Sequence, residues 1–86
     1  MTPARASSVR VVLFARYAEL LGAGALEVPA PADATVADIV SVIRRLPGGD
    51  SLPARLLCAV NLRQSLPSDP VAPGDEVALL PPLSGG

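Results

Sequence analysis

The sequence predicts an α+β fold in which a mixed sheet carries one main helix on one face. Three observations support this class. A chain of 86 residues has the length of a single domain. Half of its residues are apolar, which is sufficient for one hydrophobic core. The apolar patterns follow the order strand, strand, helix, strand, strand, which suits a sheet covered by a helix.

Two strands are expected before the main helix. Residues 9–15 are rich in β-branched side chains and lead into a short helical turn. Gly22 can end this turn, because glycine adopts the left-handed conformation at little cost. Residues 25–30 alternate apolar and polar positions, and prolines end this second strand.

The main helix has the clearest local signals. Thr35 is expected to cap its first turn, with Asp38 completing a capping box, and Pro47 and Gly48 are expected to stop it. Its apolar residues recur at helical spacing, which predicts one buried stripe against the sheet. The stripe consists of Val36, Ile39, Val40, Ile43 and Leu46.

Two further strands are expected after the helix, at residues 55–61 and 76–81. Between them, Pro73, Gly74 and Asp75 have the composition of a tight turn. The result is one domain and no internal repeat.

Side chains alternate along the last strand, because successive residues of a strand point to opposite faces. Val77 and Leu79 are expected to meet the helix, which turns Leu80 outward. An outward leucine at the start of a tail is a candidate contact for a partner protein, together with Phe14 and Pro81. The alternative is that Leu80 and Phe14 complete a core that is poor in aromatic residues.

The composition argues against several kinds of partner. The net charge is −1 and the longest basic run is Arg44-Arg45, so we expect no nucleic-acid partner. The chain has no histidine and one cysteine, Cys58, so we expect no metal site and no internal disulfide. Cys58 lies in an apolar strand and is expected to be a small buried residue. No apolar run approaches the roughly 20 residues of a membrane span, so we expect no membrane partner.

We expect the domain to comprise residues 9–81, between a flexible leader at residues 1–8 and a flexible tail at residues 82–86. The single cysteine is typical of a reduced compartment, which predicts a cytoplasmic protein.

Four phrases of the sequence resemble the β-grasp, ubiquitin-like sulfur carriers. They are "VLFARYAELLG", "TVADIV", "AVN" and "PVAPGDEVALLPPLSGG", and the resemblance extends over residues 9–86. The most similar group is the MoaD-like family, the small subunit of molybdopterin synthase.

The resemblance implies a function at the last residue. In that family an E1-like, MoeB-like adenylyltransferase uses ATP and Mg²⁺ to adenylate the terminal glycine, and a sulfur donor converts the adenylate to a thiocarboxylate. The carrier then binds the large, MoaE-like subunit and gives its sulfur to cyclic pyranopterin monophosphate. In this sequence the reactive position is Gly86. The resemblance implies a sulfur-donating subunit in a heterotetramer, with no cofactor bound to the carrier itself.

The residue types of the tail suit insertion into another protein. Gly85 and Gly86 lack the β-carbons that would obstruct a narrow channel, and Pro81 and Pro82 favour an extended exit from the domain. We expect the segment of Pro82, Leu83, Ser84 and Gly85 to enter the partner.

Other functions share these features. A sulfur carrier for thiamine synthesis, cysteine synthesis or tRNA thiolation has the same kind of tail. A ubiquitin-like modifier would instead join Gly86 to protein amines. In a simple binding module the two glycines would have no role.

Overall fold

The computed structural model describes residues 8–81. The predicted tail and residues 1–7 of the predicted leader lie outside this range. The predicted boundary between the leader and the domain is corrected at Ser8. This residue is buried and is the first residue of a strand. In chain order the elements are β1 (Ser8–Leu13), α1 (Arg16–Leu21), β2 (Ala25–Pro29), α2 (Val36–Arg44), the 3-10 helix η2 (Gly49–Ser51), β3 (Leu57–Val60), β4 (Arg63–Ser65) and β5 (Glu76–Leu80).

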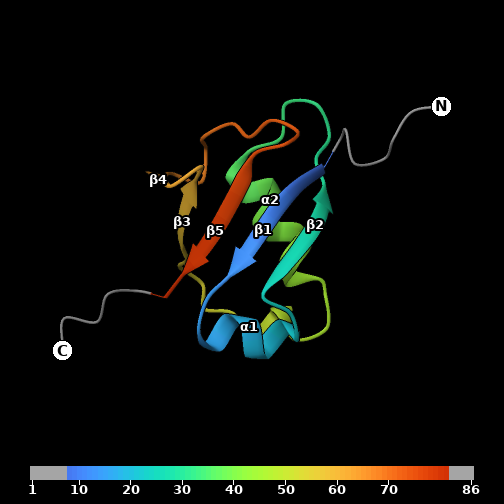
Figure 1. Cartoon of the computed structure of the whole chain (residues 1–86), viewed down its shortest axis with the longest axis vertical. Coiled ribbons are helices and arrows are strands. Elements are labelled where there is room, and N and C mark those ends of the chain that lie inside the picture. The colour runs from blue at the N-terminus through green and yellow to red at the C-terminus, as the bar shows by residue number, and fades with distance from the viewer. Residues whose placement is uncertain (1–7, 82–86) are drawn as a thin grey trace.

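The strands form one mixed sheet in the order β2-β1-β5-β3-β4. β1 and β5 run parallel in the middle, and the other neighbours are antiparallel. Figure 1 shows α2 behind the sheet and α1 beyond the end at which β1 and β5 finish. The predicted α+β fold, a mixed sheet with one main helix on one face, is therefore confirmed. No helix within residues 8–81 combines the length and the apolar character needed to cross a membrane.

The core lies between α2 and the sheet. Val77 and Leu79 are both 0% exposed, which confirms that this face of β5 meets the helix. Alternation along the strands and the helical stripe supply the other fully buried side chains. These are Val9, Val11, Val28, Val36, Ile39 and Ile43.

The predicted capping box of α2 is present. The Asp38 backbone N–H donates to Thr35 Oγ1 at 3.3 Å, and the Thr35 backbone N–H donates to Asp38 Oδ2 at 2.9 Å. Gly22 ends α1 in the left-handed conformation, with its N–H donating to the carbonyl of Ala18, also as predicted. Both features depend only on neighbours in the sequence.

Several elements differ from the prediction, and β3 covers Leu57–Val60 of the expected residues 55–61. The first strand ends at Leu13 rather than at residue 15, because Ala15 has a φ of 52°. β4 and η2 were not predicted. β4 consists of polar residues without an apolar alternation, and it exists as a strand through its pairing with β3.

Candidate functional site

The tail begins just after β5, at one end of the sheet. Leu13 pairs with Leu79, so the parallel strands β1 and β5 finish side by side (Figure 1). Pro81 follows β5 and is exposed. The chain therefore leaves the domain from a central strand. The predicted tail residues Pro82, Leu83, Ser84, Gly85 and Gly86 lie outside the described residues.

An apolar surface adjoins this exit, on the sheet face opposite α2. Leu80 lies on that face and pairs with Leu57 of β3, and both side chains are half-buried. Phe14 directly follows β1 at the same end and is 45% exposed. The structure thus brings together the predicted interface residues Leu80, Pro81 and Phe14. We call Phe14, Leu57, Leu80 and Pro81 the tail-root patch.

Leu57 was missed as an interface candidate. Alternation along the predicted strand places it on the face opposite Cys58. Its position beside Leu80 depends on the pairing of β3 with β5, which has no signal in either strand alone.

The same sheet face is charged at its other end. Arg10 and Glu76 are paired residues of β1 and β5, and their side chains form an exposed ion pair with a nitrogen–oxygen distance of 3.8 Å. Ser8 Oγ donates a hydrogen bond of 2.7 Å to Glu27. Apolar contact area is therefore concentrated at the tail end of this face.

A set of hydrogen bonds holds the start of β5. Asn61 Nδ2 donates to Asp75 Oδ1 at 3.0 Å, and the Glu76 N–H donates to Asn61 Oδ1 at 3.0 Å. The Ala72 N–H donates to Asp75 Oδ2 at 2.8 Å. The hydrogen bond from the Ala72 backbone, followed by that from Asn61, holds the pKa of Asp75 below its usual value. The phrases "AVN" and "GDEV" thus supply a structural clamp.

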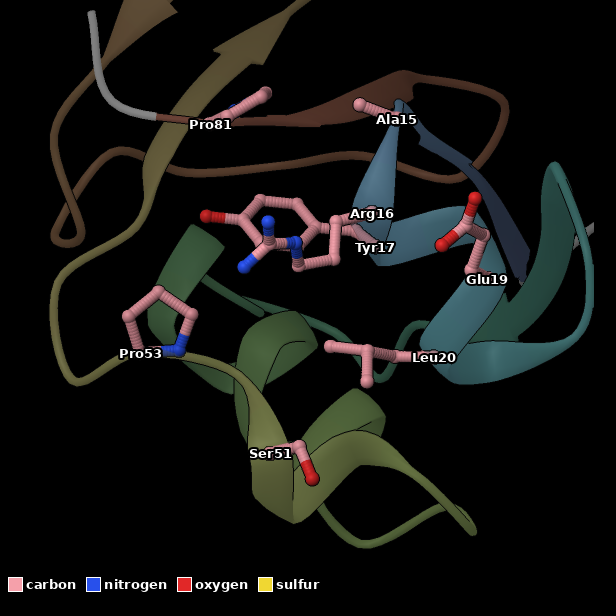
Figure 2. A pocket seen from close by; sticks show the side chains of 8 residues that line it. All are labelled: Ala15, Arg16, Tyr17, Glu19, Leu20, Ser51, Pro53 and Pro81. Carbon is pink, nitrogen blue, oxygen red and sulfur yellow. The ribbon is translucent and has the colours of Figure 1, made fainter. Parts of the chain in front are cut away.

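A hollow of about 710 Å³ adjoins Pro81, at the end of the sheet where β5 finishes. Figure 2 shows its lining at the start of α1, near η2 and at the end of β5. The side chains of Arg16 and Tyr17 extend into the space between Pro53 and Pro81. Sequence reasoning missed this site, because its walls come from three distant segments.

Cys58 lies in a second hollow of about 300 Å³ between α2 and β3–β4. Burial raises the pKa of its thiol, an effect partly opposed by the charge of Arg44. The thiol is therefore protonated at neutral pH, and Cys58 is a buried core residue as predicted. Residues 8–81 contain no group of three or more histidine, cysteine or acidic side chains placed to hold a metal ion.

Solved structures with the same fold include proteins of two kinds. SAMP1 from Haloferax volcanii is 32% identical and superposes with a TM-score of 0.79, covering 92% of this chain and 99% of that one. A putative molybdopterin converting factor, subunit 1, from Pyrococcus furiosus is 27% identical with a TM-score of 0.79, covering 88% and 98%. These similarities show that the fold is a β-grasp fold.

A third structure shows this fold within an assembly. It is the protein–protein complex of subunits 1 and 2 of Molybdopterin-converting factor from Helicobacter pylori 26695. The matching chain is 20% identical with a TM-score of 0.67, covering 92% of this chain and 99% of that one.

The model of the ThiS family matches residues 11–86. The matched range includes residues 11–13 of β1, all of β5, the tail-root patch and the two terminal glycines. The chain therefore belongs to the ThiS family, as a β-grasp protein of the sulfur-carrier or ubiquitin-like modifier type.

Proposed function

We propose that the chain is the sulfur carrier of molybdopterin synthase and acts through the carboxyl group of Gly86. The observation that carries this proposal is the family match, which continues through Gly85 and Gly86. The similarity to a putative molybdopterin converting factor subunit 1 favours the molybdenum cofactor pathway over other sulfur-transfer pathways.

The proposed chemistry requires activation by a second protein. A free α-carboxyl group has a pKa of about 3.3–3.7, so it is an ionised and unreactive carboxylate at neutral pH. An E1-like adenylyltransferase would use ATP and Mg²⁺ to convert it to an acyl-adenylate with release of pyrophosphate. Sulfur from a donor protein then replaces AMP and leaves a thiocarboxylate on Gly86. The proposed acceptor is cyclic pyranopterin monophosphate, bound by the large subunit of the synthase.

The domain would supply most of the docking energy. Ordering the five tail residues costs on the order of 5–10 kcal/mol at about 1–2 kcal/mol per residue. The tail-root patch adjoins the exit and offers the half-buried Leu57 and Leu80 with the exposed Phe14. Burial of one such side chain against a partner contributes about 1.5–3 kcal/mol. We therefore place the contact with the large subunit on this patch.

The test is intact-mass spectrometry of the full chain after incubation with the adenylyltransferase, ATP, Mg²⁺ and a sulfur donor. We expect a mass increase equal to the exchange of one oxygen atom for sulfur. A variant that lacks Gly86 is the control and should show no increase, while its urea unfolding curve matches that of the wild type. A wild-type chain whose mass stays unchanged under conditions that charge a known carrier would refute the proposal.

A second candidate function is protein modification. It is favoured by the 32% identity to SAMP1, a structure of the kind described as a small archaeal modifier protein. In that role Gly86 would form an isopeptide bond with lysine amines. Mass spectrometry of tryptic peptides from cells distinguishes the two functions, because a modifier leaves its terminal residues on the lysines of other proteins.

A further inference from the structure

The hollow beside Pro81 borders the tail-root patch. Pro81 lines the hollow and directly follows Leu80 of the patch, and one residue separates Phe14 of the patch from Arg16 of the hollow. A protein that covers the patch and receives the tail would therefore lie beside this hollow. This continuity points to a function of the hollow in docking.

The wall that carries Pro53 is held in place by α2. The Arg44 guanidinium donates hydrogen bonds to the carbonyl oxygens of Leu52, Pro53 and Ala54, at 3.2, 2.7 and 3.2 Å. Charged donors make stronger hydrogen bonds than neutral ones, so the loop after η2 is fixed to the end of the helix. The hollow is thus a built feature of the domain.

The opposite wall contains a strained residue. Ala15 has φ 52° and ψ −125°, a conformation that is unfavourable for residues other than glycine. Its carbonyl accepts a hydrogen bond from the Ala18 N–H, and the Phe14 carbonyl accepts one from the Tyr17 N–H. This turn stands between Phe14 on the patch and Arg16 in the hollow. Strained residues cluster at active sites, ligand clamps and switch regions.

The hollow presents donors that have no acceptor within residues 8–81. Arg16 is exposed and forms no ion pair with a described carboxylate. The Tyr17 side chain is buried, yet its hydroxyl makes no hydrogen bond with another described residue. Among the described residues, every buried side-chain oxygen or nitrogen has a hydrogen-bond partner. The Tyr17 hydroxyl has none, so it must be accessible to solvent although the rest of the side chain is buried. Glu19 also lines the hollow, and Figure 2 shows its carboxylate apart from the Arg16 guanidinium.

We infer that the hollow docks a carboxylate-bearing segment of the protein that receives the tail, with Arg16 as its ion-pair partner. A guanidinium binds a carboxylate through two parallel hydrogen bonds, and the hydroxyls of Tyr17 and Ser51 are further donors. The chain as a whole does not attract acidic partners, because its net charge is −1. Attraction of an acidic segment would therefore come from Arg16 at this site. The inference rests on the proposed function, because it takes the large synthase subunit as the docking protein.

The experiment compares two charge reversals by isothermal titration calorimetry, using the full chain and the purified large subunit from the same organism. Arg16→Glu should weaken binding about tenfold, because an attractive pair becomes a repulsive one. Arg63→Glu is the matched control with the same change of net charge. Arg63 is exposed on β4 and pairs with Val60, at the end of the sheet away from Pro81. We expect its effect to be less than about threefold.

A charge exchange identifies the docking carboxylate. Each exposed acidic residue of the large subunit is changed singly to lysine, and one of these variants should restore binding to Arg16→Glu while weakening binding to the wild type. Raising the salt concentration should reduce the difference between wild type and Arg16→Glu.

Equal affinities of Arg16→Glu and Arg63→Glu for the large subunit would overturn this inference. The proposed function has a different readout, the mass increase at Gly86, which does not involve the large subunit. Failure of the docking site and failure of the sulfur-carrier function are therefore distinguishable.

Discussion

At the scale of single residues, Gly48 determines how closely η2 approaches α1. Its φ is +89°, and a β-carbon at this position would collide with the carbonyl oxygen of Leu20. Leu20 also lines the hollow beside Pro81. An alanine would suffer both backbone strain and overlap with backbone atoms that cannot move freely.

We therefore expect Gly48→Ala to lower the free energy of unfolding by about 1–3 kcal/mol. The measurement is urea unfolding followed by circular dichroism. Gly24→Ala is the matched control, because a β-carbon at Gly24 has no heavy atom within 4 Å. Equal destabilisation by both changes would contradict the proposed overlap.

At the scale of elements, the turn after β3 and the turn before β5 are joined through Asn61 and Asp75. Asn61 has a φ of 50°, a conformation that asparagine tolerates better than most residues. From there it bonds both the Asp75 carboxylate and the Glu76 N–H. This clamp fixes where β5 starts, and so where it delivers the tail.

The clamp predicts a pH dependence of stability. The pKa of Asp75 is lowered in the folded chain, so the ionised carboxylate stabilises the fold. This contribution is complete above the unfolded pKa of about 3.9 and is lost as the pH falls through the lower folded pKa. Asp75→Ala should therefore be less stable than the wild type at neutral pH, with a difference that shrinks below about pH 4.

Urea unfolding of both chains across this pH range tests the prediction. The control is Asp50→Ala, which removes an exposed carboxylate of η2. A stability difference between wild type and Asp75→Ala that stays constant down to pH values below the folded pKa would exclude the ionic contribution of the clamp.

At the scale of the whole molecule, one sheet face is divided between a charged end and an apolar end. The ion pair of Arg10 and Glu76 lies at the first, and the tail-root patch lies at the second. Leu80 and Leu57 stand side by side in the patch. A partner that binds the tail-root patch would bury apolar area directly beside the tail.

We expect Leu80→Asp to weaken binding to the large subunit by roughly 1–3 kcal/mol, because a charged group would replace an apolar contact. Calorimetric titration measures the change. Leu62→Asp is the control, since Leu62 is 87% exposed in the turn between β3 and β4, at the other end of the sheet. If Leu80→Asp binds with unchanged affinity, Leu80 is not part of the interface. Thermal unfolding checks that both variants fold.

Prediction from the sequence succeeded where the cause is local. The Thr35–Asp38 capping box and the Gly22 cap are formed by neighbours, and their residue types suffice to identify them. β4 was missed because Arg63, Gln64 and Ser65 carry no apolar pattern. The hollow was missed because Arg16, Ser51 and Pro81 are far apart in the chain.

Sequence patterns alone identified the helix and its cap, the buried face of the last strand, and the family phrases that end in Gly85-Gly86. Three features required the folded chain: β5 lies between β1 and β3, Leu57 lies beside Leu80, and Arg16 lines a hollow next to Pro81. The physical reason is the range of the interactions. Caps and periodicity are set within a few residues, whereas strand order and register are set by contacts between segments that have no signal in common.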